Sequence, residues 1–364
     1  YYVPARVFCG FLESTGSLDH TRIEAFRNRF GKKGAQLITQ DMLKVAQEYG
    51  FCGPEDVDMD TTVQEAGITY PTEMKLLDHL MKKAKRFHAK LKKAGRRGIR
   101  GIKKAAKAFA KDFTEYRFFQ KTVAGKTKTI KRCVRLAQDV LAEMAESGSF
   151  IHSLPTKDQT DYQQLLALGP RLMKQILSWL ETGRVASNKI VSLWKTAPKA
   201  IKKGKVGKPV EFGRKWLVNC YRGGYVLVDA PANVKIADQH CVKESLRIHQ
   251  EVFSEPPESY ATDRGMYSEA NINRCRRAGV KKIGIQPKGR AKPIVSRRDH
   301  RRLKNRRAGI EPRLGHLKTR GLGRSRMKTD EGDIISGHRS ALGYNLCHLV
   351  RDLKRQSVSR MVAN

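Results

Sequence analysis

The chain has 364 residues, of which 40% are hydrophobic, so it is long and apolar enough to form buried cores and is not a disordered tail. Its 73 lysines and arginines against 35 acidic residues give a formal net charge of +38. Such a charge indicates a large anionic partner, with nucleic acid ahead of a membrane surface, because no long apolar run accompanies it.

Seven cysteines are scattered without a CxxC pair, which argues against a zinc site and is typical of a reducing cytosol. We find no signal peptide. The chain opens with Tyr1 and not with methionine, so we expect an N-terminal piece to be missing from it.

Residues 1–50 predict a helical module. Ser17 fits the cap of a first helix, and a second helix is expected over residues 34–49. The apolar residues of the second helix fall mostly on one side: Leu37, Ile38, Met42, Leu43 and Val45. Two helices joined at Phe30 and Gly31 fit a DNA-binding helix-turn-helix. A packing or dimerisation unit is the more common arrangement, and we favour it.

Residues 51–71 predict the first strand of a sheet. Val57 and Met59 alternate with Asp58 and Asp60, which is the period of a β-strand. Asp60 therefore points to the opposite face from Val57 and Met59. The pattern does not tell which face is the core, and Asp58 competes with Asp60 for any role as a ligand.

Residues 72–200 are predicted to be mostly helical and strongly basic. One helix is expected over residues 74–93. The run from Lys82 to Lys104 contains twelve lysines or arginines and no acid. Self-repulsion makes such a face costly in isolation, so a groove for a phosphate backbone is the better interpretation than a solvated face. The side chains expected to bind DNA there are Lys82, Lys83, Lys85, Arg86, Lys92, Lys93, Arg96 and Arg97.

The same region predicts further helices over residues 130–147 and 161–179, the second broken near Gly169 and Pro170. Another helix is expected to carry Ile190 and Trp194. The aromatic residues among 111–119 are expected in the core and not as platforms for bases. Residues 202–209 are expected to be a linker.

Residues 201–364 predict alternating strands and helices. The expected elements are strands at 212–220 and 225–228 joined by a hairpin turn, a helix at 237–252, a strand ending at 263, a helix capped by Ser268, a strand at 280–285, a basic loop at 286–294, a helix after it, and a tail helix at 334–362 with Leu342, Leu346, Leu349 and Leu353 as its apolar stripe. Asp263 would lie at the carboxyl end of a strand, where α/β sheets form ligand sites. Without the helical region, this order is close to a ribonuclease-H-like fold, with helices on both faces of one sheet.

The stretch 297–320 holds a lone glutamate among many cations. Between residues 271 and 328 the only acids are Asp299 and Glu311. Positive surroundings favour the charged form of a carboxylate and attract a polyanion. Arg307, Glu311 and Lys318 have a spacing that returns to one helix face, although a solvated basic helix with one ion pair fits this segment equally well.

Pro312 directly follows Glu311, and proline is tolerated only in the first turn of a helix. We therefore expect the helix to be split near Gly309, with Glu311 at the start of its second half. The split weakens the pairing of Arg307 with Glu311 and leaves that of Glu311 with Lys318.

Asp60, Asp263 and Glu311 are carboxylates from separate segments, and three such groups can bind two divalent cations roughly 3.5–4 Å apart. Oxygen ligands suit Mg²⁺, with Mn²⁺ as a substitute. One ion would activate a water or a 3′-hydroxyl, and the other would stabilise the leaving oxygen. Each aspartate also has an ordinary explanation, Asp263 as a turn residue and Asp60 as a cap.

Three blocks of the sequence match a known pattern in order and spacing. They are DTTVQE (60–65) with ITYPT (68–72) and KLL (75–77), TDRG (262–265) with YSE (267–269) and Asn271, and R-x3-E-x6-K (307–318) with GYNL (343–346); PVEFG (209–213) and Lys215 also fit. Together they resemble bacterial insertion-sequence transposases of the DDE type. A tyrosine is common in that family where this chain has Lys304, which puts an aromatic contact in doubt but not the metal site.

This resemblance implies an α/β fold, with a ribonuclease-H-like catalytic core and a large all-helical insertion after the first strand. The core would comprise residues 51–71 and 201–364, and the insertion residues 72–200. The enzyme would cut element ends and join 3′-OH ends to target DNA, with two Mg²⁺ ions per site. Asp60, Asp263 and Glu311 would be the catalytic metal ligands.

The basic residues of the motifs would then bind DNA. Arg307 and Lys318 would contact it near the scissile phosphate, and Arg264 and Lys304 are further candidates. The implied partners are terminal inverted repeats, target DNA and further copies of the chain as a homodimer or larger assembly, with no membrane. The implied location is the bacterial cytoplasm, at the nucleoid.

Two other functions stay open. A non-catalytic nucleic-acid-binding protein would not need carboxylates in its basic field, because binding to a phosphate backbone uses cations. A stand-alone ribonuclease-H-like nuclease would not need the large basic helical region, which favours a complex with DNA ends.

Overall fold

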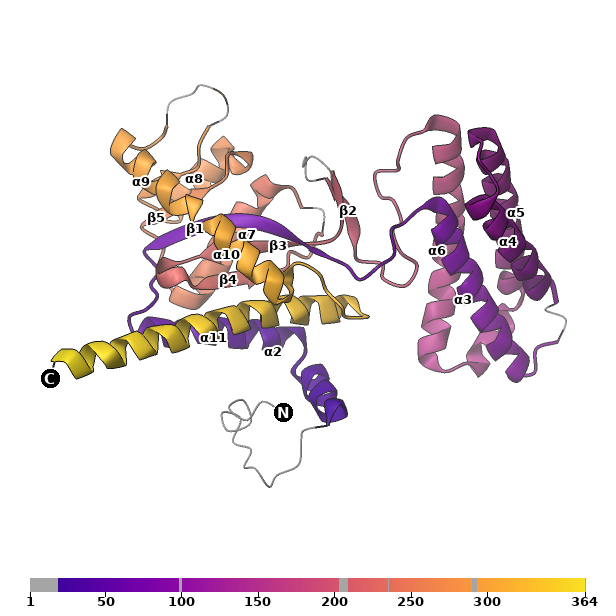
Figure 1. Ribbon diagram of the computed structural model, residues 1–364, viewed down its shortest axis with the longest axis horizontal. Coiled ribbons are helices and arrows are strands. Elements are labelled where there is room, and N and C mark those ends of the chain that lie inside the picture. Colours follow the sequence, from indigo (N-terminus) through magenta and orange to yellow (C-terminus); the bar gives the residue numbers. More distant parts are fainter. Residues whose placement is uncertain are drawn as a thin grey trace.

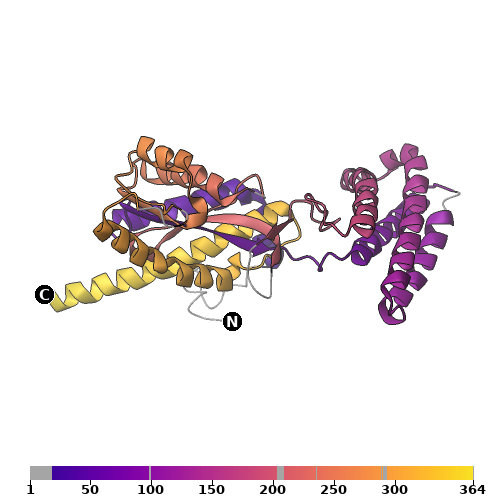
Figure 2. The same cartoon turned by 90° about the horizontal axis from the view of Figure 1, so that it is seen from above.

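The computed structural model describes residues 19–97, 100–202, 209–234, 236–287, 289 and 293–363. Over these residues it is a mixed α/β protein, in which one sheet is flanked by helices and a group of helices lies to one side (Figures 1 and 2). The sheet order is β2-β3-β1-β5-β6, and β4 also pairs with β3. The predicted α/β class is therefore confirmed.

The sheet is mixed, with β1 at its centre. Its strands are β1 (Asp56–Glu65), β2 (Lys199–Lys202), β3 (Val210–Cys220), β4 (Val226–Asp229), β5 (Ser259–Thr262) and β6 (Lys282–Gly284). β1 runs antiparallel to β3, with Asp60 opposite Val218. It runs parallel to β5, with Met59 opposite Thr262, and β5 is parallel to β6. The pairing with β5 thus stops one residue before Asp60.

The helices fall into two groups. Those around the sheet are α2 (His20–Glu48), α7 (Asp238–Phe253), α8 (Glu269–Arg277), α9 (Arg297–Ala308), α10 (Ile310–Leu317) and α11 (Asp330–Ala363). Those at its side are α3 (Glu73–Lys93), α4 (Arg100–Phe118), α5 (Val123–Glu146) and α6 (Thr156–Thr182). We call the second group the helical bundle.

Helices cover both faces of the sheet. One face carries Val57, Met59 and Leu217 and is buried by apolar residues of α2, α7 and α8. The other face carries Trp216 and Val218 and is buried by α10 and α11. α11 lies so close that a Cβ atom at Gly337 would be 2.0 Å from the Trp216 ring, so only glycine fits this crossing.

The helical bundle has an apolar core of its own, to which all four of its helices contribute. The chain enters it after β1 and returns through residues 183–198 to β2 (Figure 1). The returning segment is anchored at both ends. Lys189 binds Glu73 at the start of α3 at 2.7 Å, and Lys195 binds Asp333 of α11 at 2.7 Å, where both side chains are buried.

Several sequence expectations in the bundle region are wrong. α6 runs unbroken through Pro170, because its face of Leu165, Leu172 and Ile176 is buried on both sides of the proline. Residues 190–194 are not helical, since Gln175 of α6 holds the Ile190 backbone with hydrogen bonds in both directions. The expected linker at 202–209 overlaps β2 (Lys199–Lys202) at Lys202, and its residues 203–208 lie outside the described residues.

The aromatic residues near the end of α4 are also not all in the core. Phe118 and Phe119 are 64% and 72% exposed, because they lie at the end of α4, beyond the part of the helix that packs in the bundle core. Phe113 and Tyr116 are half-buried against the bundle core.

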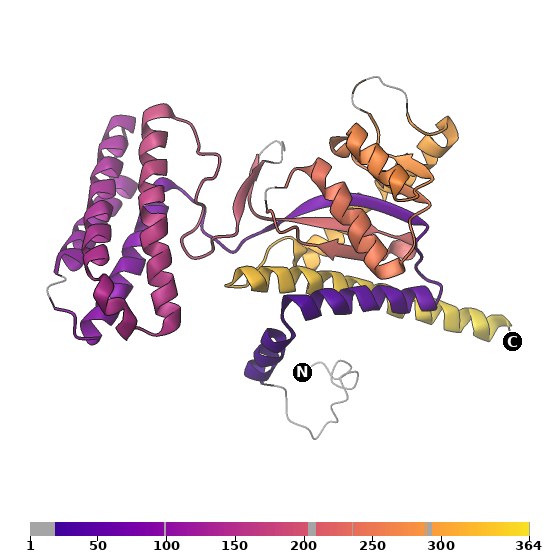
Figure 3. The ribbon, with the colours of Figure 1, turned by 180° about the vertical axis from the view of Figure 1, so that it is seen from behind.

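The N-terminal expectation holds only in part. α2 begins at His20 and contains a kink at Gly31, whose φ of 61° favours glycine; Ser17 lies outside the described residues. Leu37, Ile38 and Val45 are exposed rather than buried. The reason is that α2 packs on α11 and α7 through its Ala35–Thr39–Leu43 side (Figure 3).

The tail helix α11 begins at Asp330 and buries Ile335, Ala341 and Tyr344 against the sheet. The predicted leucine stripe lies beside this face, so Leu346 is 39% exposed. None of the helices in the described ranges has the length and apolar character needed to cross a bilayer.

Other elements agree with the sequence prediction. The hairpin between β3 and β4, helix α7 and the β5 strand that ends before Asp263 are all present. Ser268 caps α8 through the Asn271 amide at 3.2 Å. The basic helix is split at Gly309 into α9 and α10, with Glu311 in the first turn of α10.

Three aspartates on one face of β1 point toward α9. Asp56, Asp58 and Asp60 alternate along the strand and so share a side. Arg306 donates its Nε to both oxygens of Asp58 at 3.0 Å, and its Nη1 binds Asp56 and Ser259. Asp58 is only 3% exposed, and this burial raises its pKa against the opposing effect of Arg306.

We predict that Arg306→Met lowers the free energy of unfolding by roughly 3 kcal/mol at neutral pH, because it leaves the buried Asp58 carboxylate without a partner. The loss should shrink at mildly acidic pH. A carboxyl group with a raised folded-state pKa takes up its proton more readily in the folded protein, so stability is gained as pH falls through that pKa. Urea denaturation followed by circular dichroism measures both effects.

The matched control is Arg302→Met, an exposed arginine on the same helix, which should change stability by less than about 0.5 kcal/mol. Equal losses in the two variants would contradict the structural role of Arg306.

Candidate active site

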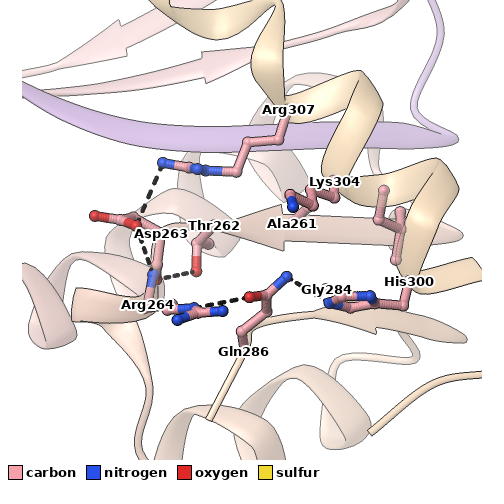
Figure 4. Close-up of a pocket in the computed structure, with 10 residues that line it drawn as sticks. Ala261, Thr262, Asp263, Arg264, Gly284, Gln286, His300, Lys304 and Arg307 are labelled. Atoms are coloured by element: carbon pink, nitrogen blue, oxygen red, sulfur yellow. Dashed lines mark hydrogen bonds and ion pairs between the residues drawn. The ribbon is translucent and has the colours of Figure 1, made fainter. Parts of the chain in front are cut away.

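Two of the three predicted carboxylates lie side by side at the sheet edge where β5 ends. Asp60 follows the last β1 residue paired with β5, and Asp263 follows the last residue of β5. One guanidinium nitrogen, Nη2 of Arg307, lies 3.7 Å from Asp60 and 3.5 Å from Asp263. Figure 4 shows the pair of Arg307 with Asp263. Asp60 and Asp263 are thus close enough to share one cationic group.

Backbone amides orient both aspartates. Asp60 accepts a hydrogen bond from the Thr61 amide, and Asp263 accepts one from the Arg264 amide, each at 2.7 Å. The Asp60 side chain is 21% exposed and that of Asp263 is 56% exposed. The pair is therefore held from the protein side and open to a ligand from the solvent side.

Glu311 does not join this pair. It is exposed in the first turn of α10 and makes no hydrogen bond or ion pair with any residue that the structure describes. Among the described residues, Arg307 and Glu311 make no ion pair with each other. The break at Gly309 separates α9 from α10, and the Arg307 side chain instead contacts Asp60 and Asp263. Lys318 lies seven residues after Glu311 and directly follows the end of α10.

Within the described ranges, no three acidic, histidine or cysteine side chains converge as a metal site. Two aspartate carboxylates nevertheless form an all-oxygen donor set, which is the chemistry that Mg²⁺ and Mn²⁺ prefer. They fit one shared cation, since the Arg307 guanidinium already lies between them. A third carboxylate ligand would require Glu311 to move toward them.

A cavity of about 200 Å³ opens beside Asp263. Its lining residues come from β5, β6, α9 and the segments after the two strands: Ala261, Thr262, Asp263, Arg264, Gly284, Gln286, His300, Leu303, Lys304 and Arg307. The structure therefore brings together four residues that the sequence singled out, namely Asp263, Arg264, Lys304 and Arg307 (Figure 4).

Sequence reasoning missed Gln286 and His300, although both carried a signal. Gln286 follows β6 at the same sheet edge as Asp263, where side chains after parallel strands converge. His300 precedes Lys304 by four residues and Arg307 by seven, which is the spacing of one helix face.

The basic residues of the bundle divide into exposed and buried groups. The exposed side chains are those of Lys82, Lys85, Arg86, Lys92, Lys93 and Arg97. Arg96 is half-buried, with its guanidinium 5.1 Å from the centre of the Phe150 ring. The bundle lies to the side of the sheet, so these cations form a surface separate from the cavity (Figure 2).

Lys83 does not fit the expected role in DNA binding, because it is 3% exposed. Its Nζ donates to the Leu193 carbonyl at 2.7 Å and lies 4.6 Å from the centre of the Trp194 ring. Burial lowers the pKa of Lys83. Its contacts tie α3 to the segment that returns from the bundle.

Comparison with known proteins identifies the domain around this site. Residues 189–346 match the family model of the transposase DDE domain, and this range includes Asp263, Arg307, Glu311 and Lys318. The resemblance to DDE transposases is thereby confirmed. The family implies a ribonuclease-H-like core, a catalytic transposase and DNA binding.

Among curated proteins, the chain is similar to the uncharacterized protein ORF8 in the nfe locus of Rhizobium meliloti. The two are 29% identical over 96 residues, which cover 24% of this chain and 46% of that protein. The match thus spans about half the length of the curated relative. No solved structure matches the chain.

Burial predicts opposite behaviour for two lysines two residues apart on α3. Lys85→Met should weaken DNA binding and reduce the slope of log K against log salt by about 1, because an exposed cation that neutralises a phosphate releases a counterion. Lys83→Met should leave the slope unchanged and lower the free energy of unfolding by about 1 kcal/mol, through the lost hydrogen bond to Leu193. Fluorescence anisotropy with labelled duplex DNA at several salt concentrations measures the slope. A reduced slope in the Lys83 variant would contradict the buried role.

Proposed function

From the match of residues 189–346 to the transposase DDE domain, we propose that the chain is the DNA transposase of an insertion sequence. It would cut the ends of the element and join their 3′-OH ends to target DNA by metal-dependent phosphoryl transfer. The observation that carries the site assignment is the pair of aspartates, Asp60 and Asp263, held around one guanidinium at the end of β5.

Asp60 lies outside the matched range and is assigned through the sheet. The parallel pairing of β1 with β5 places Asp60 beside Asp263, whereas Asp58 is buried with Arg306. This arrangement favours Asp60 over Asp58 as the first ligand. We propose Asp60, Asp263 and Glu311 as the catalytic carboxylates, with Mg²⁺ as the natural ion, two ions per site and Mn²⁺ as a substitute.

When bound, the metal ions would activate the attacking water or 3′-hydroxyl and stabilise the leaving oxygen. The protein's own residues would perform the other tasks. Asp60 and Asp263 would hold the ions at the sheet edge, and Glu311 would turn toward them from the exposed first turn of α10. Arg307 would then leave the carboxylates and bind a phosphate oxygen, for which its planar group is suited.

The remaining cations would bind DNA on either side of the reacting phosphate. Arg264 and Lys304 line the cavity beside Asp263. Lys318 directly follows α10, the helix that carries Glu311. These positions support contacts with the backbone of the DNA end that is cut.

We propose that the helical bundle grips DNA away from the reacting phosphate. Its exposed lysines and arginines on α3 support this role. The corresponding domain boundaries are residues 1–50 for the N-terminal module, 51–71 and 201–364 for the catalytic core, and 72–200 for an inserted helical domain. Two DNA ends must be held together for strand transfer, so we propose a homodimer or larger assembly.

The test is DNA cleavage and joining by the purified chain with linear DNA that carries the candidate element ends, with Mg²⁺ or Mn²⁺. We expect Asp60→Asn, Asp263→Asn and Glu311→Gln each to slow both reactions by at least about 100-fold, because each removes a proposed metal ligand. DNA binding in the absence of metal should be retained by all three.

The matched control is Asp299→Asn, a half-buried carboxylate in the first turn of α9 in the same basic stretch, which should keep full activity. Cleavage that survives the three ligand substitutions would reject the site assignment. Cleavage without joining would favour a stand-alone nuclease, and salt-dependent binding without any cleavage would favour a non-catalytic DNA-binding protein.

A further inference from the structure

Two consecutive hydrogen bonds link His300, Gln286 and Arg264, which all line the cavity. The Arg264 Nε donates to the Gln286 side-chain oxygen at 2.8 Å. On the other side, the Gln286 Nε2 lies 2.6 Å from the His300 Nε2 (Figure 4). Gln286 thus connects α9 to the residue that directly follows Asp263.

The chemistry of the three groups fixes the direction of both bonds. An arginine Nε only donates, so the Gln286 oxygen must face Arg264 and its amide nitrogen must face His300. The amide nitrogen also only donates, so the His300 Nε2 must accept. His300 is therefore neutral in this arrangement, with its proton on Nδ1.

We propose that Gln286 and His300 are positioning residues for Arg264, and that they hold it beside Asp263 only while His300 accepts through Nε2. This inference rests on the proposed function, because it assigns to Arg264 a contact with the DNA backbone at the catalytic site. The bond from Gln286, which His300 holds in turn, restricts the guanidinium to one direction and so reduces the entropy lost when it binds a phosphate.

Protonation of His300 would disrupt this pair of hydrogen bonds. Both ring nitrogens would then donate, and the Gln286 amide would face a donor at each end with a single oxygen to offer. Either the bond to Arg264 or the bond to His300 would be lost. Arg264 would keep its charge but lose its fixed direction.

Other charged groups also surround His300, and their effects on cleavage must be distinguished from the effect of the imidazole. Among the described residues, Asp263, Arg264, Lys304 and Arg307 line the same cavity. α9 also packs on β5, which has no charged residue, and on β6, where Lys282 binds Glu258 at 3.4 Å. Variants at position 300 therefore have to isolate the contribution of the imidazole.

The direct test is the tautomer of His300. Long-range ¹H–¹⁵N NMR spectra of histidine-labelled protein, assigned with a His300→Gln variant, should show the neutral form protonated on Nδ1. The same spectrum of Gln286→Met should lose this preference, because methionine cannot donate to Nε2. A wild-type signal from the form protonated on Nε2 would overturn the proposal.

The functional test uses substitutions that keep or remove the acceptor. Gln286→Met and His300→Lys should each slow DNA cleavage roughly tenfold, since one removes both bonds and the other places a permanent donor opposite the amide. His300→Gln offers an amide oxygen, so it should recover most of the loss seen in His300→Lys. Gln250→Met, an exposed position on α7, is the control.

A double-mutant cycle shows whether the effect passes through Arg264. In an Arg264→Ala background, Gln286→Met and His300→Lys should cause no further loss, either in cleavage or in affinity for duplex DNA measured in EDTA. Full additive losses would overturn the positioning role. The affinity cycle needs no catalysis, so failure of the wild-type chain to cleave DNA would reject the proposed function while the cycle and the tautomer still decide this inference.

Discussion

The proposed catalytic edge of this fold depends on three aspartates of β1 and two consecutive arginines of α9. The aspartates alternate along the strand, so all three face α9, where like charges would repel if they were left alone. Arg306 binds Asp56 and the buried Asp58, and Arg307 binds Asp60 together with Asp263 of the neighbouring strand. Arg306 pairs with the buried carboxylate of Asp58, whereas Arg307 pairs with two carboxylates that are accessible to solvent. The same pairing thus fixes α9 on the sheet and separates a structural carboxylate from the exposed pair.

This arrangement explains how a chain with a charge of +38 keeps a cluster of acids at its proposed active site. Asp60 and Asp263 are neutralised by Arg307 while they stay accessible to solvent, so the folded protein compensates their charges at little desolvation cost. A divalent ion that enters the pair would displace a cation and not fill an empty space. The displaced guanidinium would remain within reach of the phosphate that the ions activate. Under the proposed function, exchange of one cation for another would therefore couple metal binding to the capture of DNA.

The sequence predicted those features that depend on local rules. Alternation located β1, the position of Asp263 at the end of a strand followed from its neighbours, and Pro312 predicted the split between α9 and α10. Alternation alone could not choose between Asp58 and Asp60, because both lie on one face; the family resemblance favoured Asp60, and in the structure the register with β5 and the partner of Arg306 distinguish them. The burial of Lys83 was equally invisible. Its acceptor, the Leu193 carbonyl, lies more than a hundred residues away in the segment that returns from the bundle.

The path of the chain between β1 and β3 separates the bundle from the catalytic edge. The chain leaves the sheet after Glu65, which pairs with Gly213 of β3, and the Ala66 amide donates to the Phe212 carbonyl at 2.9 Å. Departure and return therefore meet at one corner of the sheet, beyond the β1 residues that carry the aspartates. The buried pair of Lys195 and Asp333 then fixes the returning segment to α11 and not to α9 or α10. A displacement of the bundle would accordingly distort this corner of the sheet and α11 more than the surroundings of Asp60. A bundle attached in this way can hold DNA firmly while the carboxylates, Arg307 and α10 remain free to rearrange around the reacting phosphate.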